Sequence, residues 1–124
     1  IIPGEKEFSA RRVEDFIKRE TKKILALRAG YYAAQLGVSF RSIALRESSS
    51  RWGSCSAGGG LSFCWRLAFA PFAVMDYVVA HEVAHLRHHH HGTAFWQAVE
   101  TLYPGYEKQE NWLKRHGQSV WQWG

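Results

Sequence analysis

The stretch PFAVMDYVVAHEVAHL, from Pro71 to Leu86, decides the fold. Proline suits the first turn of a helix, because its fixed φ is helical and its missing N–H is not needed there. Apolar side chains then recur every three or four residues, as on one face of a helix. They are Phe72, Met75, Val79, Val83 and Leu86. The pattern predicts a helix from Pro71 to about His89.

Inside this helix, His81, Glu82 and His85 form the pattern H-E-x-x-H. Residues four apart lie one turn up the same helix face, with Cβ atoms about 5–6 Å apart, so both imidazoles can bind one metal ion. Glu82 lies about 100° round the helix from His81, where it can deprotonate a water on the ion but is poorly placed to bind the ion itself. We expect Glu82 to act as general base and to pass the proton to the leaving amine.

Three fixed positions can arise by accident in a chain with seven histidines, and a helical histidine pair can be no more than solvated surface. The neighbours of this pair argue otherwise, because apolar residues surround it along the helix. These neighbours are Val78, Val79, Val83 and Leu86. We therefore interpret the pattern as a functional metal site.

A catalytic zinc site needs a third protein ligand and an open fourth position. Many candidates follow the motif: His88, His89, His90, His91, Glu100, Glu107 and Glu110. On a straight helix His88 lies about 10 Å further along the axis than His81, too far for both to bind one ion. The third ligand must then come from chain that has left the helix and turned back. His91, followed by the permissive Gly92, is best placed.

Two alternatives to His91 stay open. His90 is the second choice on the same reasoning, and Glu100 represents the other common design, in which a carboxylate from the next helix closes the site. The histidines that are not ligands would be solvated or would form a weak secondary metal patch.

The rest of the chain predicts more helices and a small sheet. A helix from about Ala10 to Leu36, with Ser9 as N-cap and Gly37 as stop, carries one apolar stripe expected to face the core. That stripe is Val13, Phe16, Ile17, Ile24, Leu27, Tyr31 and Tyr32. Alternating patterns around 42–46 and 61–67, with the 51–56 segment between them, predict an antiparallel meander of about three strands. Further helices open at Gly92-Thr93 and after Pro104-Gly105.

Composition sets wider bounds. We expect residues 1–124 to form a single domain, since 124 residues with 46% hydrophobic and 22% charged residues are typical of one globular unit. No apolar run approaches the roughly 20 residues of a membrane span. The net charge of +5 permits contact with nucleic acid, although solvation of helix faces is the simpler interpretation. We expect a cytoplasmic monomer, and the absence of an initial Met favours a fragment.

The two cysteines, Cys55 and Cys64, flank a glycine-rich turn and could face each other across a hairpin. They could form a disulfide, bind a metal, or be ordinary buried thiols. Nothing points to secretion, and a nine-residue spacing without a CxxC pair is poor for zinc. We favour buried thiols.

The combination of motifs resembles the YgjP-like family of zinc metallopeptidases over roughly residues 12–117. The matching runs are Arg51-Trp52-Gly53-Ser54-Cys55-Ser56, Trp65-Arg66-Leu67, Asp76 to Glu82, His91, Phe95-Trp96, Pro104-Gly105-Tyr106 and Trp112-Leu113-Lys114. Three positions depart from the family pattern: Val83 replaces Leu, Gly92 replaces Ser and Cys64 replaces Asn.

The resemblance implies an α+β, zincin-like fold, with a small sheet packed beside several helices that include the metal-binding helix. It also implies a peptidase that uses Zn²⁺, with His91 as the matching third histidine and a peptide or protein as substrate. Family members carry an N-terminal β-rich segment with no counterpart here, so the chain is expected to be a fragment that lacks it.

Other residues have candidate roles beside the metal. In zincins a peptide often binds as an added strand, and the 51–56 segment with Arg51, Trp52 and Gly53 is the candidate edge. The same three residues could merely shape a tight strand crossing. Tyr106 and His116 are candidate oxyanion stabilisers, each with packing as the alternative. Asp76 could orient a ligand or interact with the positive start of its helix.

Two other functions remain open. One is a nucleic-acid-associated protease similar in logic to SprT-like enzymes, which digest proteins bound to DNA. The other is a non-catalytic binding module in which zinc is structural. Structural zinc sites are usually rich in cysteine, and none lies near His81 in the sequence, which argues against the second.

Overall fold

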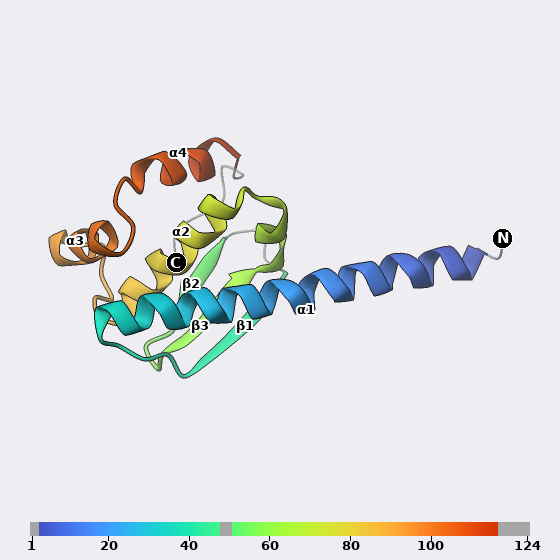
Figure 1. Ribbon diagram of the computed structural model, residues 1–124, viewed down its shortest axis with the longest axis horizontal. Helices are drawn as coiled ribbons and strands as arrows, with labels where there is room; N and C mark the ends of the chain where they lie inside the picture. Colours follow the sequence, from blue (N-terminus) through green and yellow to red (C-terminus); the bar gives the residue numbers. More distant parts are fainter. Residues whose placement is uncertain (1–2, 48–50, 117–124) are drawn as a thin grey trace.

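The computed structural model describes residues 3–47 and 51–116 and has an α+β architecture (Figure 1). The elements in chain order are α1 (Pro3–Leu36), β1 (Ser42–Arg46), β2 (Gly53–Cys55), β3 (Gly60–Cys64), the short 3-10 helix η1 (Trp65–Phe69), α2 (Phe72–His85), α3 (Thr93–Leu102) and α4 (Glu107–His116). The predicted fold class, a small sheet beside several helices, is confirmed. No helix in these ranges is both long and apolar enough to cross a membrane.

The sheet is mixed, so the prediction of an antiparallel meander is wrong in one pairing. The strand order is β1-β3-β2, with β2 antiparallel to β3 and β1 parallel to β3. The β2–β3 hairpin turns at Gly59, whose φ of 90° favours glycine. In this order β3 is the central strand, and β1 and β2 are the two edges of the sheet. Alternation in the sequence identifies strands, but it does not determine which strands become neighbours.

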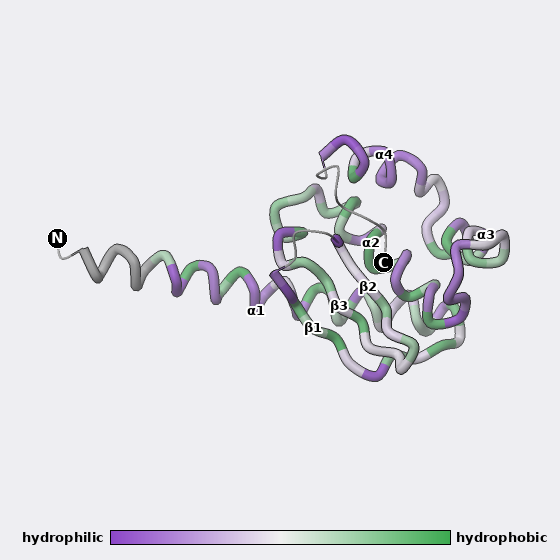
Figure 2. The backbone as a smooth tube through the Cα atoms, turned by 180° about the vertical axis from the view of Figure 1, so that it is seen from behind, coloured by the Kyte–Doolittle hydropathy of each residue, from purple (hydrophilic) through white to green (hydrophobic). Residues whose placement is uncertain are grey.

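Helix α2 is the centre of the molecule. Every residue from Val74 to His85 is buried, because α1, the sheet and the two C-terminal helices all pack around it. Leu61 and Phe63 of β3 point toward it and are almost fully buried. Figure 2 shows the apolar segments gathered where α2 meets the strands, with the polar α4 outside. A helix buried on all sides carries its histidines into the core.

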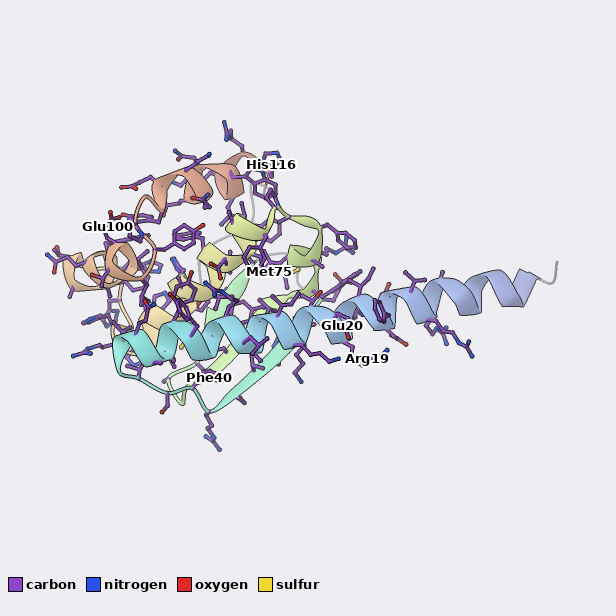
Figure 3. The ribbon with its side chains drawn as sticks, viewed as in Figure 1. Arg19, Glu20, Phe40, Met75, Glu100 and His116 are labelled. Atoms are coloured by element: carbon purple, nitrogen blue, oxygen red, sulfur yellow. The ribbon has the colours of Figure 1, made fainter. Side chains whose placement is uncertain are left out.

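Helix α1 uses a different face from the predicted one. It begins at Pro3, so Ser9 lies inside it and is not its N-cap, while the predicted stop at Gly37 is confirmed with φ 73°. Much of the predicted stripe is exposed: Val13 58%, Phe16 55%, Leu27 74% and Tyr31 50%. Figures 1 and 3 show that the helix runs past the domain, with Arg19 and Glu20 on the stretch where it leaves.

The buried face of α1 is lined by smaller residues. It consists of Thr21, Leu25, Ala29, Tyr32 and Ala33. Small side chains let the α1 and α2 backbones approach closely, and Arg28 and Tyr32 then reach Asp76 across the interface. Tyr32 is the one member of the predicted stripe on this face, and the other four positions were not part of the stripe.

Two elements are shorter than predicted. Helix α2 ends at His85 instead of about His89, and the strand expected over 61–67 ends at Cys64, where the chain turns into η1. The cysteines do not face each other, since Cys55 lies opposite Leu61 in the hairpin. Both are free thiols, as favoured, although Cys55 is only half-buried. Burial raises the pKa of the Cys55 thiol to about 11.

A pair of substitutions two residues apart tests the α1 assignment. Leu25→Ala should lower the free energy of unfolding by about 2–5 kcal/mol, because it opens a cavity in the core. Leu27→Ala, on the exposed stripe, should change it by less than about 0.5 kcal/mol. Urea denaturation followed by circular dichroism measures both. Equal losses would mean that the stripe is covered.

Candidate metal centre

The structure brings the rings of His81, His85 and His91 together. One nitrogen from each lies within 4.8 Å of the other two, and the Nε2 atoms of His85 and His91 are 3.0 Å apart. Bonds of about 2.0–2.1 Å to one tetrahedral ion place ligand nitrogens roughly 3.3 Å apart. Small side-chain movements would therefore make the three nitrogens ligands of one ion. Among the His, Cys, Asp and Glu side chains of the described ranges, these three histidines lie close enough together to hold a metal ion.

A tight turn at the end of α2 returns the chain to the site. The N–H groups of Arg87 and His88 both donate to the carbonyl of Ala84, which ends the helix. The chain then bends back through His91 into α3. Gly92 has a φ of −87°, so the bend does not need the freedom of glycine predicted for it. Because the helix ends early, His88 is not on it, and its ring is not in the histidine group.

The tautomer of His85 is fixed by a backbone contact. Its Nδ1 lies 3.1 Å from the carbonyl oxygen of His88. A carbonyl can only accept, so Nδ1 carries the proton and donates it. The lone pair is then on Nε2, which faces His91. The imidazole thus presents the nitrogen that a metal ion requires.

A second polar chain supports His81. Its Nδ1 lies 3.3 Å from the hydroxyl of Tyr77, which in turn lies 3.4 Å from a carboxylate oxygen of Glu110 on α4. When the Tyr77 hydroxyl donates to Glu110, the Nδ1–H of His81 donates to Tyr77, and Nε2 is left as the metal-binding atom. This contact links the metal centre to the last described helix.

One aromatic ring packs against all three histidines. Phe95 of α3 is fully buried. Its ring centroid lies 5.0 Å from that of His81, 4.4 Å from that of His85 and 4.9 Å from that of His91. Trp96 adds contacts to His81 and His91. These rings restrict the imidazoles to one arrangement and form the apolar wall of the site. They also explain the pKa of His81, which burial holds well below its usual value, helped by His85 and His91.

The carboxyl group of Glu82 is buried beside the histidines. Its two carboxylate oxygens have no hydrogen-bond partner among the described residues, and Oε2 lies 4.0 Å from Nε2 of His81. The edge strand closes over it at Gly53, where an added Cβ would lie 3.1 Å from the Glu82 Cγ. Burial raises the pKa of Glu82 well above its usual range, and the positive charge of Arg51 opposes that shift.

Some predicted residues lie near this centre. Gly53 and Arg51 are beside Glu82, on and just before the edge strand β2. Trp52 is half-buried, and its carbonyl accepts from the N–H of Cys64. Tyr106 stacks on Trp96 and lines, with His91 and Glu100, an open cleft of about 600 Å³.

Other predicted residues lie elsewhere. Asp76 does not contact a histidine ring as proposed for an orienting carboxylate; both its oxygens accept from Arg28, and Oδ2 also accepts from Tyr32. His116 is exposed at the end of α4, with its ring stacked on Trp112 (Figure 3). Glu100, an alternative third ligand, is exposed on α3 and lies outside the histidine group. His90, the other alternative, is exposed in the turn before α3 and also lies outside the group.

The sequence patterns assign no role in the site to Tyr77 or Phe95, and they indicate Glu110 only as a possible metal ligand, not as the partner of Tyr77. Tyr77 stands four residues before His81, hence one turn down the same face, which is a signal that could have been used. Phe95 stands four residues after His91, across the start of α3. Glu110 gave no comparable signal for this role, because it reaches Tyr77 only through the packing of α4 on α2.

Helix α2 carries two buried histidines and a buried carboxylate, and the exposed His91 returns beside them after the helix ends. This arrangement beneath a small sheet is typical of a metallopeptidase centre. The sequence matches the YgjP-like family, described as a metallopeptidase domain, over residues 3–116. The chain belongs to this YgjP-like family, as its motifs suggested, and metallopeptidase activity and a metal ion follow from that membership.

A solved structure supports the fold. The chain is similar to the crystal structure of the metallopeptidase zymogen of Pyrococcus abyssi abylysin, with a TM-score of 0.65 and 19% sequence identity. The similarity covers 74% of this chain and 94% of the abylysin chain. No curated protein matches the chain.

The buried carboxylate predicts a pH dependence of stability in metal-free protein. Well below pH 4.5, Glu82 is protonated in both the folded and the unfolded chain. As the pH rises above that value the unfolded chain ionises first, so Glu82 lowers folding stability progressively up to its raised folded pKa. Glu82→Gln removes this loss. The stability of the variant relative to the parent should therefore increase between pH 5 and 8.

Thermal melts of chelator-treated protein at several pH values measure this difference. Glu14→Gln, which changes an exposed carboxylate on α1, is the matched control and should show little such trend. A parallel pH profile for Glu82→Gln and the parent would mean that the carboxylate is solvated.

Proposed function

We propose that this domain is a zinc-dependent peptidase in which Glu82 is the general base. The observation that carries the proposal is the buried carboxylate of Glu82, 4.0 Å from His81 Nε2 and beside three converging imidazoles. Burial of a carboxylate is costly for folding, so a position like this is typical of a functional group.

Zinc suits the donor set. Three imidazoles with room for a further ligand are a known catalytic arrangement for Zn²⁺, whereas structural zinc sites are closed and usually include cysteine. Cys55 and Cys64 are not in the group. Burial lowers the pKa of His81 and of His91, so both rings are neutral at physiological pH, as metal binding requires.

The roles of the residues follow from their positions. His81, His85 and His91 hold the ion, and Tyr77, Phe95 and the His88 carbonyl orient their rings. A bound zinc ion would supply acidification of water and polarisation of the scissile carbonyl. Glu82 accepts the proton from the attacking water and delivers it to the leaving nitrogen.

The substrate binds along β2. This strand is at the sheet edge, with β3 as its one partner among the described strands, so its outer side offers backbone groups to an extended peptide. Gly53 brings that edge into contact with Glu82. A peptide paired with β2 would thus place a backbone carbonyl next to the general base.

Metal content tests the ligand set. Purified protein should hold about one zinc ion per chain, and His81→Ala, His85→Ala and His91→Ala should each lose most of it. His88→Ala should keep it, because residue 88 contributes its backbone carbonyl rather than its ring. Elemental analysis after dialysis, with circular dichroism to confirm folding, measures the result. Loss in His88→Ala but not in His91→Ala would reverse the assignment.

Hydrolysis tests the general base. Glu82→Gln should keep zinc but cleave a quenched fluorescent peptide at least about 100-fold more slowly, the usual contribution of a positioned base. Glu14→Gln, an exposed change of the same chemistry on α1, should leave the rate unchanged. Full activity in Glu82→Gln would remove Glu82 from the mechanism, and full zinc with no activity in the parent would favour a structural metal.

A further inference from the structure

The outer face of the sheet forms a polar groove with no acidic residue. A hollow of about 430 Å³ lies along the strands, lined by Ser42, Ala44, Arg46, Arg51, Ser54, Cys55, Ser56, Gly60, Leu61 and Ser62. A second hollow of about 220 Å³ shares Arg46, Arg51, Ser54 and Ser62 with it. We call the two together the arginine groove. Its lining contains two guanidinium groups and four hydroxyls but no carboxylate.

Arg46 is held in this groove by a neighbouring strand. Its Nε donates to the hydroxyl of Ser62 at 3.0 Å, which fixes the guanidinium across β1 and β3. The group has five N–H donors, and in the described ranges it forms no ion pair with a carboxylate. Small side chains around it leave space for an incoming group. A planar guanidinium beside hydroxyls is suited to bind an oxyanion such as a carboxylate.

The groove is continuous with the catalytic side through β2. Successive residues of a strand point to opposite faces, so Gly53 faces Glu82 while Ser54 lines the groove. Arg51, at the start of the same segment, lines the groove and is close enough for its charge to act on Glu82. In a peptide added to β2, the side chains level with Gly53 would face the metal centre, and those level with Ser54 would face the groove.

We propose that the arginine groove is a specificity subsite that binds an acidic side chain of the substrate peptide through Arg46 and Arg51. The inference rests on the proposed function, because it requires a peptide on the β2 edge. It assigns the substrate class as peptides with Asp or Glu near the scissile bond. A single carboxylate fits better than a nucleic acid strand, because the one aromatic residue of the lining, Phe63, is buried and offers no stacking platform.

Cleavage of a peptide series by the zinc-loaded protein tests the subsite. The series carries Glu, Gln or Lys at one position at a time in an otherwise neutral sequence. At one position near the scissile bond, kcat/KM should be about 10-fold higher for Glu than for Gln, and lower for Lys. Arg46→Glu and Ser54→Asp, on different strands, should each reverse the order of Glu and Lys. Arg19→Glu, exposed on α1, makes the same charge change as Arg46→Glu and should leave the order unchanged.

Binding separates the two proposals. A labelled Glu-containing octapeptide should bind zinc-loaded Glu82→Gln about 10-fold more tightly than its Gln counterpart, and Arg46→Glu should abolish the difference. If the parent cleaves neutral peptides with no preference at any position, the subsite is wrong and the peptidase stands. If it cleaves nothing but binding still depends on Arg46, the groove stands and the peptidase is wrong.

Binding of DNA is measured as a third test. A labelled 20-base-pair DNA duplex should bind weakly and be insensitive to Arg46→Glu. Tight duplex binding that falls steeply with salt and is lost in Arg46→Glu, with peptides bound regardless of charge, would overturn the proposal.

Discussion

The buried carboxylate of Glu82 is the constraint on which the rest of the structure depends. A carboxyl group removed from water, with no hydrogen-bond partner among the described residues, is costly for folding. The surrounding core must supply that stability. Helix α2 is accordingly buried on every side, by α1, the sheet and the two C-terminal helices. The small residues of α1 and the glycine in β2 permit the close packing that this burial requires.

The histidines are held by contacts of three different kinds. A backbone carbonyl orients His85, a tyrosine hydroxyl orients His81, and the ring of Phe95 packs against all three imidazoles. Each contact comes from a different part of the chain. The site is therefore preorganised by tertiary structure, and its geometry depends on α3 and α4 as much as on the helix that carries the motif.

Short-range patterns in the sequence were sufficient for the core of the site. The spacing of His81 and His85 fixes their common helix face, and the need to leave the helix pointed to His91, which the structure brings to them. Features that depend on contacts between distant segments were not accessible. No local pattern specifies that β3 lies between β1 and β2. The predicted face of α1 is wrong because four of its five buried positions, including Thr21, Ala29 and Ala33, lie outside the stripe of large apolar residues. The contacts of Asp76 are likewise long-range, since its partners Arg28 and Tyr32 lie in α1.

The contact at Gly53 has a consequence for the spacing between the sheet edge and helix α2. Residue 53 has no side chain to hold the β2 backbone away from Glu82, so main-chain packing sets how closely the strand and the helix approach. A larger residue would move the sheet edge away from the helix and any peptide with it. The distance between this sheet edge and the Glu82 side chain is thus a property of the scaffold itself.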